Sequence, residues 1–154
     1  MSLEVHAVSD VTADLTEALS RLIPQLSKLA PPITAEFLAE IVACPTNTLF
    51  IARLDGRIVG TLTLVVFPIP TGYRAWIEDV VVDSEAQGQK VGSALTESAL
   101  ARADELGSRT VDLTSRASRA AANHLYRKLG FEQRESNLLR YTPSDISEEL
   151  ETRS

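Results

Sequence analysis

The sequence predicts an α+β fold, a mostly antiparallel mixed sheet of about six to seven strands flanked by helices. Two observations carry this prediction. Asp55-Gly56 separates two stretches rich in Val, Ile, Leu and Thr, which is the pattern of a two-residue hairpin. Further along, Val80-Val81-Val82 leads through a glycine-containing loop into an amphipathic helix, as expected of a buried strand followed by a helix that covers the sheet. Residues 1–142 are expected to form a single domain.

The segment before the hairpin is expected to hold one strand and two helices. Residues 3–8 alternate between apolar and polar, which indicates a half-buried strand. Asp10 or Thr12 then caps a helix with leucines at three- and four-residue spacing, and Pro24 is expected to break or kink it. Thr34 is expected to cap a second, shorter helix. Its predicted apolar face comprises Phe37, Leu38, Ile41 and Val42.

The rest of the chain is expected to alternate strands and helices. A meander of strands at 48–54, 57–67 and 73–83 is followed by a helix over 92–106 and a fifth strand over 109–114. Ser118 is expected to cap the last helix, after which two short strands are predicted at 131–134 and 138–142. The acidic tail, 143–154, is expected to be flexible.

Composition limits the classes of function. The chain has 154 residues, 44% of them hydrophobic, and its single cysteine, Cys44, excludes an intrachain disulfide, which favours a cytoplasmic setting. Apolar runs fall short of the roughly 18 residues that span a bilayer, so no membrane role is expected. A net charge of −6 argues against a nucleic-acid partner and suits a neutral or cationic small molecule. His6 and His124 have no partner at metal-ligand spacing, so no metal site is predicted.

The loop from Gln87 to Ser93 is the first candidate for chemistry. It opens a helix, and the first N–H groups of a helix lack partners while its dipole favours an anion. Glycines at 88 and 92 would let a phosphate or pyrophosphate approach the backbone. The alternative is an ordinary strand-to-helix connection that needs glycine for its turn. Neither a Walker A loop nor a dinucleotide-binding fingerprint fits this spacing.

The second candidate segment is Asn123-His124-Leu125-Tyr126-Arg127-Lys128-Leu129-Gly130-Phe131. Together with Gln87-Gly88-Gln89-Lys90-Val91-Gly92 and the Asp-Gly hairpin, it resembles the GNAT superfamily of acyl-CoA-dependent N-acetyltransferases. The resemblance extends from about residue 49 to 141. Either motif alone has low specificity, but both occur here in order and at the expected spacing.

The resemblance implies acetyl-CoA as co-substrate and assigns roles to individual residues. The pantetheine arm would lie along the backbone of Val80, Val81 and Val82, in a gap between that strand and the next. The pyrophosphate would be held by the loop, and the expected contacts there are Gln87, Gly88, Gln89, Lys90, Val91, Gly92 and Ser93. Tyr126 would lie near the thioester sulfur, where it can act as the acid, although a buried aromatic is the alternative. Asn123 would contact the cofactor, or else serve the helix start or meet solvent.

Glu78 is the second expected catalytic residue. In some polyamine-type members of the family, a Glu at the matching position orders the water that deprotonates the amine; a structural carboxylate is the alternative. Because neighbours on a strand face opposite ways, Glu78 is expected to share a face with Trp76 and Val80, and Asp79 with Ile77 and Val81.

One position departs from the family pattern. Lys90 stands where the first motif glycine is usual. A lysine held at positive φ would cost of order 1 kcal/mol, whereas a helical backbone would tolerate it. We expect the helical alternative, because Gly88 and Gly92 are retained.

The sequence therefore predicts an N-acetyltransferase that moves the acetyl group from acetyl-CoA to a primary amine of a small, cationic acceptor. The alternative is a catalytically silent acyl-CoA-binding or sensor domain of the same fold. A homodimer is an expectation by fold analogy only. The acceptor itself is left open.

Overall fold

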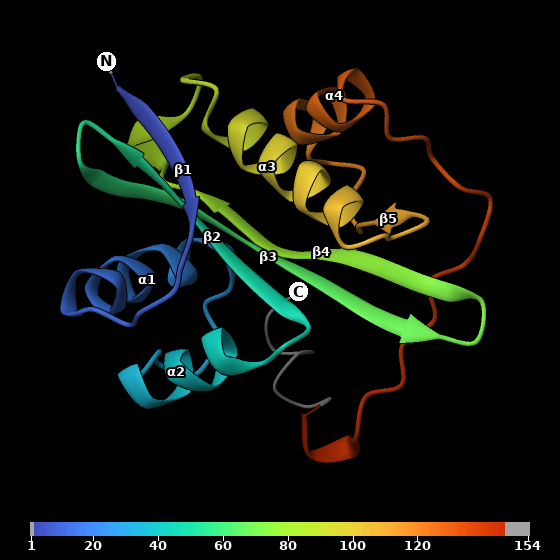
Figure 1. Ribbon diagram of the computed structural model, residues 1–154, viewed down its shortest axis with the longest axis horizontal. Coiled ribbons are helices and arrows are strands. Elements are labelled where there is room, and N and C mark those ends of the chain that lie inside the picture. The colour runs from blue at the N-terminus through green and yellow to red at the C-terminus, as the bar shows by residue number, and fades with distance from the viewer. Residues whose placement is uncertain (1, 147–154) are drawn as a thin grey trace.

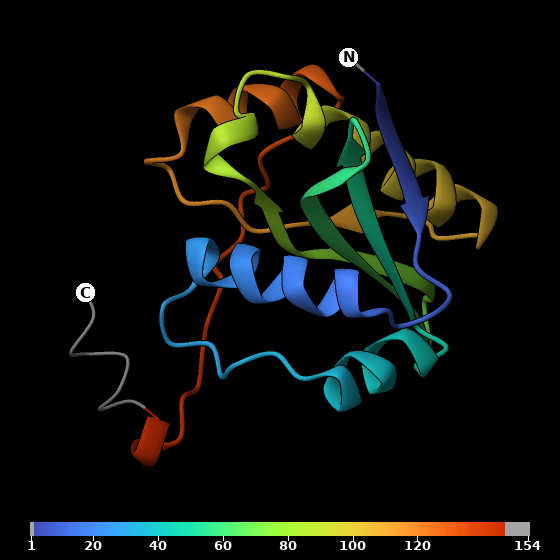
Figure 2. The ribbon, with the colours of Figure 1, turned by 90° about the vertical axis from the view of Figure 1, so that its left-hand side faces the viewer.

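The computed structural model describes residues 2–146. Its centre is a five-stranded mixed sheet in the order β1-β2-β3-β4-β5 (Figure 1), in which only the β4–β5 pair is parallel. Helices α1 and α2 cover one face, the α1/α2 face, and helices α3 and α4 lie on the other, the α3/α4 face (Figures 1 and 2). The elements are β1 (Leu3–Ala7), α1 (Ala13–Leu26), α2 (Ala35–Ala43), β2 (Asn47–Leu54), β3 (Arg57–Ile69), β4 (Gly72–Val82), η1 (Ser84–Ala86), α3 (Val91–Glu105), β5 (Val111–Asp112) and α4 (Ala120–Lys128).

The first two helices begin at threonine caps, as predicted. Thr12 accepts a hydrogen bond from the N–H of Leu15, and Thr34 accepts one from the N–H of Phe37, so each cap satisfies a donor that the helix leaves unpaired. Pro24 does not end α1, contrary to expectation. It stands in the last turn, and the helix continues to Leu26.

Both β-hairpins are tight. Asp55 and Gly56 have φ values of 51° and 86°, which confirms the two-residue turn, since this turn type needs positive φ at both central positions. The second hairpin was expected to have a longer turn at 68–72. Instead, β3 and β4 pair up to Ile69 and Gly72, so the two strands extend further than the sequence suggested.

Each face of the sheet has its own hydrophobic core. On the α1/α2 face, Leu15, Leu19, Leu22 and Leu38 pack on Ile51 and Ile58. On the α3/α4 face, Val91, Leu95, Ala99 and Ala103 of α3 pack on the alternate residues of β2, β3 and β4. Leu106, also predicted in this apolar stripe, is exposed instead. Helix α3 approaches β3 closely at Gly60, where an added Cβ would lie 2.9 Å from Val91 Cγ1 and 3.0 Å from Leu95 Cδ1. Only glycine therefore fits at this position.

The C-terminal part departs most from expectation. The sheet has five strands rather than six or seven, because 131–134 and 138–142 pair with no other strand in the described part of the chain. A short extended stretch becomes a strand only where a neighbouring strand supplies a ladder partner. The predicted strand over 109–114 shortens to Val111–Asp112. In the tail, 144–146 are helical, and 147–154 lie outside the described residues.

A buried ion pair ties α1 to the end of β4. Arg21 Nη1 donates to Asp83 Oδ2, and Nη2 donates to the carbonyl oxygen of Ile58 at 2.8 Å. The Asp83 side chain is only 5% exposed, and its other carboxylate oxygen accepts the N–H of Glu85 at 3.1 Å. One carboxylate therefore fixes both α1 and the turn that leads to α3.

We predict that Arg21→Ala lowers the free energy of unfolding by about 3–5 kcal/mol, because it leaves the Asp83 carboxylate buried without its cation. Chemical denaturation measures the change. Arg53→Ala is the matched control: it removes another arginine bonded to α1, but its partner Asp14 is 57% exposed, so the loss should stay below about 1 kcal/mol. Equal losses in the two variants would contradict the role given to the buried pair.

Candidate active site

An extra residue in β4 shapes the candidate site. Thr61 pairs with Val81, but Thr63 pairs with Glu78, so β4 contains one residue more than β3 between these pairs. Asp79 is at this β-bulge, with φ at 48°. Aspartate is among the few residues that tolerate a left-handed backbone.

Because of the bulge, the side chains of β4 do not alternate between the two faces of the sheet as the sequence predicted. Glu78 pairs with Thr63, and Asp79 lines a pocket with Thr61 and Thr63, so both carboxylates lie on the α1/α2 face. Val80 packs into the core of the opposite face. The strict alternation of a regular strand would have separated the two acids and left Val80 beside Glu78.

The two neighbouring acids influence each other. Partial burial, followed by repulsion from the Asp79 carboxylate, raises the pKa of Glu78, and the Arg140 guanidinium acts in the opposite direction. Arg140 belongs to the segment after α4, which runs from the α3/α4 face toward the α1/α2 face (Figures 1 and 2). A raised pKa brings the carboxyl group closer to neutral pH, where a general base works best.

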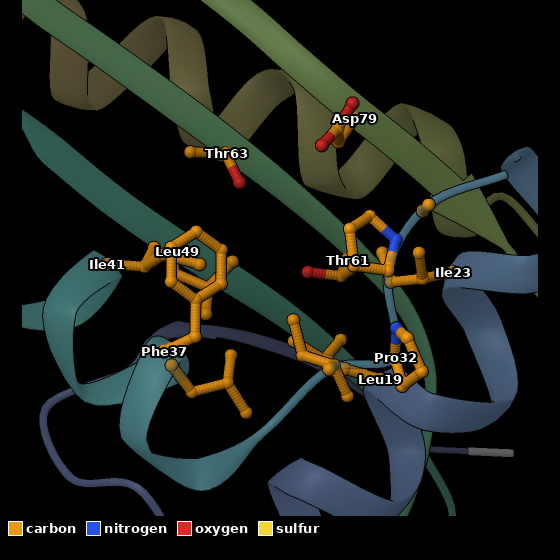
Figure 3. Close-up of a pocket in the computed structure, with 13 residues that line it drawn as sticks. Leu19, Ile23, Pro32, Phe37, Ile41, Leu49, Thr61, Thr63 and Asp79 are labelled. Carbon is orange, nitrogen blue, oxygen red and sulfur yellow. The ribbon is translucent and has the colours of Figure 1, made fainter. Parts of the chain in front are cut away.

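A pocket of about 460 Å³ opens beside these acids on the α1/α2 face. Asp79 forms part of its wall from β4, and Phe37 and Ile41 contribute from α2 (Figure 3). The volume falls within the range of about 300–1,000 Å³ that is usual for small-molecule sites. The full lining comprises Leu19, Ile23, Ala30, Pro31, Pro32, Ile33, Phe37, Leu38, Ile41, Leu49, Thr61, Thr63 and Asp79.

The loop before α3 has the features of an anion site. Lys90 is at the N-cap of α3 and makes no side-chain capping bond, so the first N–H groups of this helix are left for another partner. The space beside Gly88 is open, because a Cβ there would meet no atom within 4 Å. Gln89 Oε1 is buried without a hydrogen-bond partner. Gln87, in contrast, is engaged: its Nε2 donates to the carbonyl oxygen of Val82 at 3.2 Å.

Lys90 does not have the helical backbone that we expected. Its φ is 65°, in the left-handed region. The chain must turn at this residue to enter α3, and the turn imposes positive φ whichever residue is present. Lysine is therefore strained here, by of order 1 kcal/mol.

The edge of β4 that faces away from β3 has a strand partner only in the first half of β4. Strand β5 pairs with β4 only at Ala75 and Trp76. From Ile77 to Val82, the edge that faces away from β3 pairs with no strand among residues 2–146. The two strands therefore separate near the bulge, as the family resemblance implied.

Tyr126 lies on the α3/α4 face. Its neighbour Leu125 packs close to Gly92 in the first turn of α3, and its ring meets Phe131 edge to face, with centroids 5.7 Å apart. Burial raises the pKa of Tyr126, with a smaller opposing effect from Arg119, so its phenol keeps its proton through neutral pH. Glu78 and Tyr126 thus lie on opposite faces of the sheet.

The start of α4 differs from the prediction. Ser118 does not cap the helix; the N-cap position is Arg119, which makes no side-chain capping bond. Asn123 Nδ2 donates to the carbonyl oxygen of Arg116 at 3.0 Å, so this group braces the loop before α4.

The sequence did not single out the pocket or the part that Asp79 plays in it. Phe37 was expected in the apolar face of α2, but it is 54% exposed and lines the pocket. Pro31-Pro32 and Asp79 lie far apart in the chain, and no local pattern joins them. The one available signal was the pair of adjacent acids in an otherwise apolar strand.

Comparison with known proteins identifies the family. The model of the acetyltransferase (GNAT) family matches residues 15–131, a stretch that includes both motifs and the candidate site. The chain therefore belongs to the acetyltransferase (GNAT) family.

Individual relatives agree with this assignment. The mycothiol acetyltransferase of Cellulomonas flavigena is 36% identical over 88 residues, which make up 53% of this chain and 25% of that protein. The chain thus spans about a quarter of the length of this relative. An aminoglycoside acetyltransferase from an uncultured soil metagenomic sample, solved in complex with trehalose, has a TM-score of 0.80 at 23% identity, over 92% of this chain and 95% of that one. AAC(6')-Iy, solved with the bisubstrate analog CoA-S-monomethyl-acetylneamine, has a TM-score of 0.77 at 16% identity, over 93% and 99% of the two chains. These two likenesses concern the fold alone.

Two further observations complete the description. Within residues 2–146, no three His, Cys, Asp or Glu side chains lie close enough together to hold a metal ion. No helix in the same range is both long enough and apolar enough to cross a membrane.

We predict that the pKa of Glu78 responds to its two charged neighbours in opposite directions. Asp79→Asn should lower it by removing a like charge, and Arg140→Gln should raise it by removing the opposite charge. Titration of the carboxyl carbon by NMR measures both changes. Asp55→Asn, at another aspartate with positive φ, should leave the titration unchanged. If Asp79→Asn raised the pKa, the repulsion would be refuted.

The raised pKa also fixes the sign of a stability effect. Because folding raises the pKa of Glu78, the folded state favours the protonated carboxyl. This contribution to stability is present at pH values below the pKa of Glu78 in the unfolded chain, and it is lost as pH rises through the pKa in the folded protein. Glu78→Gln should therefore raise the free energy of unfolding at neutral pH and change it less in mild acid. A variant destabilised only at neutral pH would contradict this assignment.

Proposed function

We propose that this protein is an N-acetyltransferase that moves the acetyl group from acetyl-CoA directly to a primary amine of a small acceptor. The observation that carries the proposal is the free edge of β4 from Ile77 to Val82, which can be approached from both faces of the sheet. An uncapped helix start and a protonated phenol lie on one face, and two carboxylates beside a pocket lie on the other. Two reactants could therefore meet at the edge without a covalent enzyme intermediate.

Acetyl-CoA fits the α3/α4 side of this edge. The unpaired N–H groups at the start of α3 and the open space beside Gly88 together suit an anionic, hydrogen-bond-accepting group such as a pyrophosphate. The free edge from Val80 to Val82 offers backbone donors and acceptors for the amides of the pantetheine arm. When bound, acetyl-CoA supplies the activated acetyl thioester. The residues proposed to hold it are Val80, Val81, Val82, Gln87, Gly88, Gln89, Lys90, Val91, Gly92, Ser93 and Asn123.

Glu78 is proposed to remove the proton from the amine. An alkylamine with a pKa near 10.4 is almost entirely ammonium at pH 7, and reaching the free amine costs about 4.6 kcal/mol. The raised pKa of Glu78 makes this carboxylate a stronger base than an ordinary glutamate. It can accept the proton directly or through a water molecule while the amine nitrogen attacks.

Tyr126 is proposed to supply a proton at the opposite end. Its raised pKa keeps the phenol protonated, so it can hydrogen-bond the departing sulfur or donate to it. The backbone N–H group of Val80 can donate to the carbonyl oxygen as negative charge develops there, whereas Val81 pairs with Thr61 of β3. The chain's own residues thus provide a base, an acid and an oxyanion donor.

We predict that Ser93→Glu weakens acetyl-CoA binding by at least about tenfold, because a carboxylate in the first turn of α3 repels a pyrophosphate bound there. The fold should persist, since the helix dipole favours an acidic side chain at this position. Gly92→Glu is a poorer test, because its Cβ would already touch Leu125 Cδ2 at 3.4 Å and the rest of the side chain could disturb this packing. Isothermal titration calorimetry measures the affinity.

Ala101→Glu is the control for this prediction. It adds the same charge to α3, at an exposed position far along the helix. Its affinity for acetyl-CoA should match that of the wild type. If both variants bound equally well, the pyrophosphate would lie elsewhere.

We predict that Tyr126→Phe lowers kcat by about 10²–10⁴-fold while the KM for acetyl-CoA changes little, because only the proton donor is lost. Release of free CoA thiol in the presence of an amine measures the rate. Tyr141→Phe, at a phenol that is 90% exposed, should keep the wild-type rate. If Tyr126→Phe also turned over at that rate, Tyr126 would be only a packing residue.

A further inference from the structure

The pocket beside Asp79 has an unusual chemical character for a site that receives an amine. Aliphatic, aromatic and proline side chains make up most of its lining (Figure 3), and its polar members are Thr61, Thr63 and Asp79. Thr61 is already engaged, because its hydroxyl donates to the carbonyl oxygen of Phe50 at 3.0 Å. Little of the wall can therefore satisfy a polar ligand.

Charge in this lining is confined to one place. Among residues 2–146, Asp79 is the one charged residue that lines the pocket, and Glu78 adjoins it on the same face. The two carboxylates repel each other, and a cation seated beside them would relieve that repulsion. The wall thus offers one anionic corner and an otherwise apolar surface.

We infer that the pocket binds a monoamine carried on an apolar body, alkyl or aromatic, with its ammonium group at Asp79 and its body against α2 and the Pro31-Pro32 wall. The inference rests on the proposed function, under which this ligand is the acetyl acceptor. It restricts the small cationic acceptors suggested by the sequence to those with a single ammonium group on an apolar body. A polyamine or an aminoglycoside-like compound would bring further ammonium or hydroxyl groups against side chains that cannot pair with them.

A homologous series of n-alkylamines tests the inference. These amines have nearly the same pKa as a lysine side chain, so only the apolar body changes along the series. Each methylene buried in the pocket should raise affinity by about fourfold, from propylamine to hexylamine. Isothermal titration calorimetry with CoA present measures binding, and thiol release from acetyl-CoA measures transfer in parallel.

Two probes of equal chain length isolate the charge requirement. Hexane-1,6-diamine differs from hexylamine by a second ammonium, and hexan-1-ol lacks the charge altogether. Both should bind at least about tenfold more weakly than hexylamine, the diamine because its second charge must enter the apolar wall. Equal binding of either probe would overturn the inference.

Two variants with matched controls locate the ligand. Asp79→Asn keeps a residue that tolerates positive φ and should weaken hexylamine binding by about 10- to 100-fold, whereas Asp55→Asn should not. Phe37→Ala should weaken binding by about fivefold, whereas Tyr73→Ala, which removes an aromatic ring of similar exposure outside this pocket, should not.

The two readouts separate failure of the inference from failure of the proposed function. Affinity that stays flat along the alkyl series overturns the inference, even if some other amine is acetylated. Affinity that rises along the series without thiol release overturns the transferase proposal and supports the ligand class. Thiol release with the diamine but not with hexylamine overturns the inference and leaves the transferase proposal standing.

Discussion

The insertion of one residue in β4 is the constraint on which the rest of the candidate site depends. A strand directs successive side chains to opposite faces, so an extra residue reverses the facing of everything after it. Ile77 and Val80 both reach the core of the α3/α4 face, and between them Glu78 and Asp79 both turn toward α1 and α2. The bulge requires a left-handed backbone at Asp79, and aspartate tolerates that conformation. It also lies where β5 stops pairing, so the edge of β4 is free beside the two acids.

The starts of the α-helices α1 to α4 fall into two classes. Thr12 and Thr34 cap α1 and α2, which line much of the pocket beside Asp79 and pack the core of the α1/α2 face. Lys90 and Arg119 stand at the N-caps of α3 and α4 without side-chain bonds. The first N–H groups of α3 therefore lack a side-chain cap, and the lysine beside them has a strained backbone. Both features lower stability locally, and both are consistent with a site for an anion.

The two faces of the sheet carry complementary chemistry. On one face, a phenol that keeps its proton lies beyond an open helix start. On the other, a carboxylate with a raised pKa adjoins an apolar pocket. Arg21 and Asp83 connect these regions mechanically, because the same buried carboxylate fixes α1 and the turn that enters the loop before α3. A second bond joins the same elements, because Gln25 Oε1 of α1 accepts the N–H of Ser84 at 3.0 Å.

The sequence by itself determined the features that depend on neighbours along the chain. The Asp55-Gly56 turn, the threonine caps and the buried stripe of α3 follow from local dihedral and periodicity rules, and the two motifs indicated the family. Tertiary structure decided what depends on distant partners. Strands over 131–134 and 138–142 did not form, because no sheet edge within residues 2–146 pairs with them, and Lys90 took positive φ because the turn into α3 required it. The bulge at Asp79 arises from the register between β3 and β4, and the pocket from segments as far apart as Leu19 and Asp79. Register and enclosure are properties of packed surfaces, so no short stretch of sequence specifies them.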